Sequence, residues 1–179
     1  MGVRSRYILV DWLLDVQHNW NLSIYTLYLA INILDRYLER NSIEMKKFQL
    51  IGITCLLIAS KIEDIQAPTI ADCSEVTNEA YTINEVVEME RHLLETFNYI
   101  VRAPTALPFL NRFLQICKAP KTIRKTASFY SEAALHEYKM LQYKPSLVAF
   151  SSVLLALNNR SVRLRDDLFG PLPGIVSLS

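Results

Sequence analysis

The chain has 179 residues, of which 51% are hydrophobic and 21% are charged, and its formal net charge at pH 7 is +1. This composition is typical of a globular protein with a full core, and the small net charge argues against a broad basic surface for nucleic acid or an anionic membrane. The three cysteines lie far apart in the sequence and form no C-x-x-C pair, which favours a reduced, intracellular protein.

The first hundred residues show apolar residues at helical spacing in four places. The predicted helices cover residues 6–20, 23–39, 46–62 and 82–97. Ser23 is a suitable N-cap for the second helix, and Thr82 with Glu85 forms a capping box at the start of the fourth. A short segment from Pro68 to about Val76 lies between the third and fourth helices.

The third predicted helix is the most informative stretch of the chain. From Phe48 to Glu63 it carries apolar residues on every face, so we expect it to be buried among other helices. It is too short to span a bilayer, and the chain opens directly on an amphipathic pattern, so we expect a soluble protein without a signal peptide. Lys61 ends the run, and its ammonium must reach water or find acceptors, because an unpaired buried charge is costly.

A second set of helices repeats the first in order and character. The predicted helices cover residues 105–117, 122–142 and 145–157. They follow the first three at a nearly constant offset of about 98 residues, which indicates an internal duplication of a five-helix unit. The third helix is again apolar on nearly every face, and its small residues permit close helix approach. These small residues are Ala149, Ser151, Ser152 and Ala156.

We therefore expect an all-α fold made of two copies of one unit. The first copy covers residues 1–102 and the second covers residues 103–179. The sequence Gly-Pro-Leu-Pro-Gly at 170–174 does not form a helix, so we expect an extended C-terminal tail and an incomplete second copy.

Several segments of this chain resemble the cyclin family, most closely the mitotic A- and B-type cyclins. The matching segments are Arg6–Leu13, Leu29–Leu38, Gln49–Gly52, Leu57–Asp64, Tyr81–Thr82, Met89–Glu90 and Pro104–Phe113. The resemblance implies a duplicated cyclin fold. It also implies a regulatory subunit, not an enzyme, that binds and activates a cyclin-dependent Ser/Thr protein kinase in cell-cycle control, in the nucleus and cytoplasm.

The resemblance assigns the characteristic cyclin-box residues to Arg6, Asp35, Leu50, Lys61 and Glu90. It implies that Lys61 and Glu90 bind backbone groups of the kinase, while Arg6 and Asp35 form a structural ion pair between the first two helices. Apolar residues on the same rim would supply affinity. The candidates for kinase binding are Lys61, Glu90, Ile62, Ile65, Leu93 and Phe97. From spacing alone, the two charged residues are also consistent with an internal ion pair, and each apolar candidate with a core position.

The resemblance also implies a shallow patch that recruits Arg-x-Leu-type peptides of substrates or inhibitors. Its counterparts in this chain are Ser5, Ile8, Leu9, Trp12, Asp15, Phe48 and Gln49. Three positions depart from the family, because Ser5 replaces a methionine, Asp15 a glutamate and Phe48 a leucine. The serine removes one apolar wall of the patch, and the shorter aspartate shifts the negative charge that would meet a basic residue of the peptide. The alternative interpretation is that the apolar members of this set face the core.

Patterns typical of enzymes and metalloproteins are missing from the sequence. The three histidines are isolated, and four glycines are too few for a glycine-rich phosphate loop, so we expect no metal and no cofactor. The basic residues are dispersed, and we expect no nucleic-acid or membrane partner. Two alternative functions stay open: a cyclin-fold transcription factor that binds promoter DNA, and a helical scaffold that binds linear peptides but no kinase.

Overall fold

The structure is a computed structural model that describes residues 3–158 of the chain. Its regular elements are all helical, and no strand occurs within this range. The helices are α1 (Val3–Asn19), α2 (Ile24–Arg40), α3 (Phe48–Glu63), α4 (Ile70–Val76), α5 (Ile83–Thr96), α6 (Ala106–Ile116), α7 (Lys121–His136) and α8 (Pro145–Asn158), with short 3-10 helices η1 (Met45–Lys47) and η2 (Tyr138–Gln142). Between residues 3 and 158, no helix has both the length and the apolar character needed to cross a bilayer. The expected extended tail and its 170–174 sequence lie outside the described residues.

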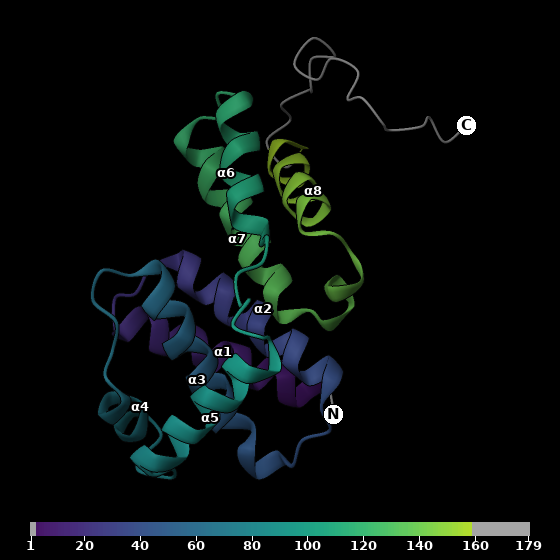
Figure 1. Cartoon of the computed structure of the whole chain (residues 1–179). Coiled ribbons are helices and arrows are strands. Elements are labelled where there is room, and N and C mark those ends of the chain that lie inside the picture. The colour runs from purple at the N-terminus through teal and green to yellow at the C-terminus, as the bar shows by residue number, and fades with distance from the viewer. Residues whose placement is uncertain (1–2, 159–179) are drawn as a thin grey trace.

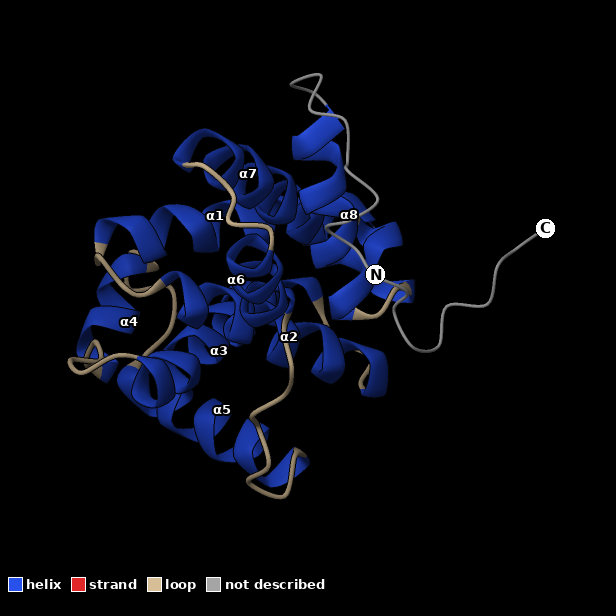
Figure 2. Ribbon diagram, turned by 90° about the horizontal axis from the view of Figure 1, so that it is seen from above, coloured by secondary structure: helices blue, strands red, loops and turns tan. Residues whose placement is uncertain are grey.

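The helices form two groups that pack against each other (Figure 1). The first group is α1–α5 and the second is α6–α8, and short loops connect the helices in both (Figure 2). Each group has its own cluster of buried apolar side chains. Tyr28 of α2 belongs to the second cluster, and its hydroxyl donates a 2.7 Å hydrogen bond to Ser131 Oγ of α7. The two cores therefore meet at α2.

Helix α3 lies at the centre of the first unit, as its sequence predicts. Every residue from Leu50 to Ser60 is buried, and the helix packs against α1, α2, α4 and α5. Gly52 permits the close approach of α1, because a Cβ atom at this position would lie only 2.8 Å from Leu9 Cδ1. A larger side chain would push the two helices apart.

The predicted helix starts are confirmed by their caps. Ser23 Oγ accepts a hydrogen bond from the Tyr25 amide at the start of α2, and Thr82 with Glu85 forms the capping box of α5. A second capping box, which the sequence analysis missed, begins α4 with Thr69 and Asp72. The acid there is an aspartate instead of the more usual glutamate or glutamine.

Helix α7 ends earlier than its sequence predicts. The apolar pattern indicates one helix over 122–142, whereas α7 ends at His136 and the chain turns into η2. Arg6 Nη1 donates hydrogen bonds to the carbonyl oxygens of Leu135 at 2.8 Å and of His136 at 3.3 Å. In a longer helix these carbonyl oxygens would accept hydrogen bonds from backbone amides four residues later in the chain. The Arg6 guanidinium supplies the donors in place of those amides.

The internal duplication is visible at the level of single hydrogen bonds. In α3, Thr54 Oγ1 donates to the Leu50 carbonyl at 2.7 Å, and in α8, Ser152 Oγ donates to the Val148 carbonyl at 2.8 Å. Both members of the second pair lie 98 positions after those of the first. The two helices therefore correspond residue by residue, with the offset that the sequence predicts.

Arg6 forms a buried ion pair within the first unit and also binds the second unit. Its side chain is almost fully buried, and it binds Asp35 of α2 through two bonds, Nε to Oδ1 at 2.7 Å and Nη2 to Oδ2 at 2.8 Å. Burial raises the pKa of the Asp35 carboxyl, while the hydrogen bonds and charge of Arg6 act in the opposite direction. Together with its bonds to the end of α7, Arg6 connects α1, α2 and α7.

Asp35→Ala is expected to lower the free energy of unfolding by about 3–5 kcal/mol, because it leaves the buried Arg6 guanidinium without its counter-charge. Urea unfolding followed by circular dichroism measures this change. Glu44→Ala is the matched control, since it breaks an exposed ion pair with Lys46 and should leave the unfolding midpoint unchanged. Equal midpoints for the two variants would contradict the prediction.

Candidate functional site

Lys61 and Glu90 form an ion pair at the surface of the first unit. Lys61 lies in the last turn of α3 and Glu90 in α5, and Lys61 Nζ is 2.5 Å from Glu90 Oε1. The Lys61 side chain is 44% exposed and that of Glu90 is 16% exposed. The lysine at the end of the buried helix therefore has an acceptor within its own chain. A single carboxylate oxygen cannot engage all three ammonium donors, so the pair retains capacity to bind a further backbone group.

The end of α3 that carries Lys61 is fixed to the start of α2. The first carboxylate oxygen of Asp64 accepts a 2.7 Å hydrogen bond from the Ser23 amide, and the second accepts a bond from Thr26 Oγ1 at 2.5 Å. Asp64 thus satisfies an amide at the start of α2 while it anchors the residue after α3. The sequence alone did not indicate this contact, because it joins positions about forty residues apart.

The four apolar candidates do not lie together at the surface. Ile65 is fully exposed and Ile62 is half-buried, so both are accessible near Lys61. Leu93 and Phe97 belong to the first core, with exposures of 0% and 4%. The prediction that Leu93 and Phe97 lie on a binding rim is therefore wrong, because both lie on the side of α5 that packs inward.

The outer face of α5 carries apolar residues that the sequence analysis missed. Ile83 and Val87 are exposed, and with Glu90 and the half-buried Leu94 they follow the helical spacing of a single face. After α5, Tyr99 and Ile100 are also exposed. The sequence indicates this outer face by a second apolar stripe, which runs beside the stripe of residues that face the core. We call Ile65, Ile83, Val87, Tyr99 and Ile100 together with the Lys61–Glu90 pair the α3/α5 surface.

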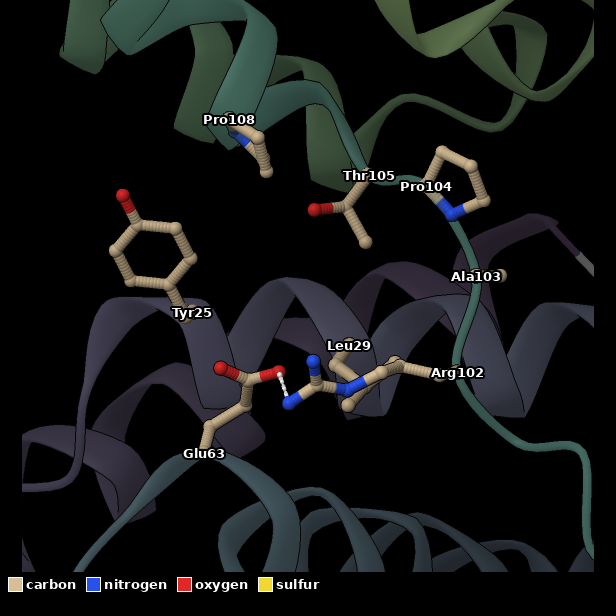
Figure 3. A pocket seen from close by; sticks show the side chains of 8 residues that line it. All are labelled: Tyr25, Leu29, Glu63, Arg102, Ala103, Pro104, Thr105 and Pro108. Carbon is tan, nitrogen blue, oxygen red and sulfur yellow. Dashed lines mark ion pairs between the residues drawn. The ribbon is translucent and has the colours of Figure 1, made fainter.

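A cavity of about 360 Å³ lies next to this region, at the junction of the two units (Figure 3). Glu63, two residues after Lys61, forms a 3.2 Å ion pair with Arg102 in the linker on one side of the cavity. Tyr25 of α2 and Thr105 and Pro108 of the second unit line the other parts. The two charged residues that line the cavity thus pair with each other.

The predicted peptide-docking residues are divided between surface and core. Ser5, Ile8, Trp12 and Asp15 follow one face of α1; Ile8 is 58% exposed and Trp12 is half-buried. Gln49, at the start of α3, is also half-buried. Leu9 and Phe48 are buried in the first core, so their expected place at the surface of the patch is corrected. The core interpretation holds for Leu9 and Phe48, while peptide docking by the exposed and half-buried members stays a prediction.

Two of the cysteines in the part of the chain that the structure describes are buried. Residues 3–158 contain no group of three histidine, cysteine or acidic residues that is suited to hold a metal ion. Burial raises the pKa of the Cys73 thiol to about 12, and the fully buried Cys55 thiol is shifted in the same direction. Both thiols are therefore protonated at neutral pH and poor nucleophiles.

Comparisons with known proteins agree with this architecture. The model of the cyclin N-terminal domain matches residues 1–102 and that of the cyclin C-terminal domain matches residues 104–168. Cyclin-B2-1 of Arabidopsis thaliana is 42% identical over 156 residues, which cover 87% of this chain and 36% of that protein. G2/mitotic-specific cyclin-2 of Medicago sativa is 39% identical over 156 residues, covering 87% and 48%. The chain thus spans less than half the length of these curated relatives.

Two solved structures have a similar fold. The X-ray structure of a viral cyclin from herpesvirus saimiri has a TM-score of 0.81 at 25% identity, covering 94% of this chain and 78% of that one. A chain of the CAK complex from Chaetomium thermophilum has a TM-score of 0.66 at 16% identity, covering 93% and 57%. At that identity the second likeness concerns the fold alone.

Lys61→Ala is expected to change the free energy of unfolding by less than about 1 kcal/mol, because the Lys61–Glu90 pair is open to water on the lysine side. Thermal unfolding of the variant and the wild type tests this expectation. Asp35→Ala serves as the destabilising reference on the same instrument. A loss from Lys61→Ala as large as that from Asp35→Ala would assign the pair to fold stability.

Proposed function

We propose that this chain, which belongs to the cyclin family, binds a cyclin-dependent Ser/Thr protein kinase and activates it. The Lys61–Glu90 pair carries this proposal, because it presents a donor and an acceptor from two helices at one point of the surface. Its similarity to Cyclin-B2-1 and to G2/mitotic-specific cyclin-2 supports a role in cell-cycle control. The chain itself supplies no catalytic group in this proposal, and its expected compartments are the nucleus and cytoplasm.

The two charged residues are suited to orient a partner. Each lies on a helix with a fixed end: the bonds of Asp64 hold the C-terminal end of α3, and the Thr82–Glu85 capping box holds the N-terminal end of α5. Side chains held on rigid helices lose less conformational entropy when they bind than flexible surface charges do. We expect Lys61 to donate to a backbone carbonyl of the kinase and Glu90 to accept from a backbone amide.

The exposed apolar residues are suited to supply the affinity. Ile65 is fully exposed, and burial of one such side chain contributes about 1.5–3 kcal/mol. Ile83, Val87, Tyr99 and Ile100 add further apolar area on the α3/α5 surface. Once a kinase covers them, Lys61 and Glu90 would be buried hydrogen-bonding charges, and removal of such groups costs about 2–5 kcal/mol, so the pair would contribute affinity as well as orientation.

Activation would follow from a shift in the kinase's conformational equilibrium. A cyclin that binds the kinase's αC helix only in its inward position stabilises that position. The αC glutamate then pairs with the catalytic lysine, and the activation segment moves clear of the substrate groove. The proposed role of this chain is therefore to select a conformation that the kinase rarely adopts alone.

This proposal accounts for more of the surface than either alternative does. A peptide scaffold would not require a rigid donor and acceptor from two helices beside an apolar stripe. A DNA-binding factor would require a basic face, whereas the chain carries 19 basic and 18 acidic residues. Kinase binding uses the Lys61–Glu90 pair, Ile65 and the outer face of α5 in one contact.

The double variant Lys61→Ala/Glu90→Ala is expected to weaken capture of a purified cyclin-dependent kinase by at least about 100-fold while the fold stays intact. Affinity capture and phosphorylation of a model substrate measure binding and activation. The matched control is Glu44→Ala/Lys46→Ala, which removes another exposed ion pair of the first unit. Equal capture by both double variants would disprove the role of the pair. Failure of the wild type to capture or activate the kinases tested would count against the proposed function.

A second candidate function is the recruitment of Arg-x-Leu-type peptides. Ile8 and Trp12 present apolar surface on one face of α1, and Asp15 follows them on the same face. An apolar peptide side chain would pack against Ile8 and Trp12, while the peptide's arginine pairs with Asp15. The buried Leu9 and Phe48 would lie beneath this contact without forming it.

Trp12→Ala is expected to weaken binding of a fluorescent Arg-x-Leu peptide by about tenfold, because the indole is the largest apolar side chain on this face. Fluorescence polarisation measures the affinity. Met45→Ala removes an exposed apolar side chain outside the patch and should leave the affinity unchanged. If the wild type does not bind the peptide, or if both variants bind it equally, the patch has no such function.

A further inference from the structure

The segment that leaves α5 carries two neighbouring exposed apolar side chains. Tyr99 is 67% exposed and Ile100 is 71% exposed, and both belong to the α3/α5 surface. Val101 follows them and is buried in the first core. The chain then runs past α2 to the start of α6 (Figures 1 and 2). Side chains in such a connection bind a partner at low entropic cost only if the backbone that carries them is already ordered.

The backbone of this segment is left-handed at two consecutive residues. Asn98 has a φ of 49° and Tyr99 has a φ of 62°. Asparagine adopts this conformation readily, whereas it is unfavourable for a bulky residue such as tyrosine. The Tyr99 amide donates a 2.8 Å hydrogen bond to the Leu94 carbonyl, and the Ile100 amide donates one of 2.9 Å to the Phe97 carbonyl. These bonds satisfy two amides of the segment, so its carbonyl groups need donors from elsewhere.

Arg36 of α2 supplies those donors. Its Nη1 donates a 2.8 Å hydrogen bond to the Val101 carbonyl, and its Nη2 donates one of 3.2 Å to the Ile100 carbonyl. The two acceptors are consecutive in the chain, so the planar fork of one guanidinium holds two neighbouring peptide groups at once. Ile100 is thereby bound through both its amide and its carbonyl, while its side chain stays exposed.

The Arg36 guanidinium is itself held in place by an aromatic ring and by a residue one turn earlier in α2. It lies over the buried Phe97 ring at 4.4 Å from the ring centre, and Arg40 lies over the same ring at 5.4 Å. Asn32 Oδ1 accepts a further 3.4 Å hydrogen bond from Nη1. Among residues 3–158, no carboxylate lies within ion-pair distance of Arg36. Its donors are therefore directed at the segment after α5 and not at an acidic side chain.

We propose that Arg36 is a positioning residue for kinase binding, because it holds Tyr99 and Ile100 in the conformation that contacts the kinase. This inference rests on the proposed function and adds a residue that acts on the α3/α5 surface without belonging to it. Without the guanidinium, the two carbonyl groups would turn to water, and the unfavourable conformation of Tyr99 would lose a constraint. The segment would then have to be ordered at the moment of binding, at a cost in affinity.

The alternative role for Arg36 is to stabilise the fold alone, and Arg124 offers the matched comparison. Arg124 also donates two hydrogen bonds to main-chain carbonyl oxygens near the end of a helix. Its Nε bonds Ala119 at 3.0 Å and its Nη2 bonds Leu114 at 3.1 Å. Arg124 belongs to α7 of the second unit, and its bonds hold the end of α6. Arg124→Ala therefore reports the general effect of removing an arginine of this kind.

Amide hydrogen exchange of the free chain, measured by mass spectrometry, tests whether Arg36 orders the segment. Arg36→Ala is expected to speed the exchange of residues 98–102 at least about tenfold, because their hydrogen bonds open more often. Arg36→Lys keeps the charge but lacks the fork, so it should resemble Arg36→Ala. Arg124→Ala should leave the exchange of this segment unchanged. Unchanged exchange in Arg36→Ala would overturn the proposal, whether or not a kinase binds.

A mutant cycle with a purified cyclin-dependent kinase tests whether Arg36 acts through the two apolar side chains. The second variant of the cycle is Tyr99→Asn/Ile100→Ala, which removes apolar surface while asparagine tolerates the left-handed conformation. Arg36→Ala is expected to weaken kinase binding about tenfold in the wild-type chain, but less than about twofold in the background of the second variant. Arg124→Ala should leave the affinity unchanged in both. Titration calorimetry measures the affinities, and circular dichroism ensures that the compared chains are folded.

The outcomes separate this inference from the proposed function. If the wild type binds the kinase and Arg36→Ala binds equally well, the positioning role is wrong. Equal weakening by Arg36→Ala in both backgrounds would also overturn it, because Arg36 would then contact the kinase itself or act on the whole fold. If the wild type binds none of the kinases tested, the proposed function fails and the role of Arg36 in kinase binding fails with it, whatever the exchange experiment shows.

Discussion

The buried guanidinium of Arg6 holds the two halves of this molecule in one arrangement. It binds Asp35 through two charge-assisted hydrogen bonds and takes the last carbonyl oxygens of α7, so α1, α2 and α7 meet at one side chain. Burial of both charges costs desolvation free energy, which the attraction between them offsets only because the geometry is good. The pair therefore contributes more to the choice of one packing arrangement than to net stability.

Helix α3 connects this packing to the proposed function. The middle of α3 is buried on all sides, which holds its C-terminal end in place. Lys61 therefore pairs with Glu90 at a fixed point of the surface. Asp64 fixes the next residues to the start of α2. A surface charge on such a support is a stereospecific contact point, whereas the same lysine on a mobile loop would contribute little to orientation.

The central helices of the two copies differ in their final residues and in the exposure of matching side chains. The first copy has a covered central helix and ends it with Lys61, while Asn159 stands at the matching position of the second copy. The second copy keeps the apolar character of its central helix but leaves Leu155 exposed where Leu57 is buried. Only the first copy therefore has a lysine at this position of the sequence, where it pairs with Glu90.

The sequence by itself determined the helices, the caps at Ser23 and Thr82, the duplication and the family, because periodicity and capping depend on residues within about four positions of each other. Only the tertiary structure decided which side chains stay accessible. Four apolar residues expected at the surface lie in the core, whereas Ile65, which is also apolar, is exposed. The four buried residues are Leu9, Phe48, Leu93 and Phe97. It also decided that α7 ends at His136, since the cause is an arginine 129 positions away from Leu135 in the chain. Contacts between residues so far apart in the chain depend on how the helices pack, which local sequence patterns do not encode.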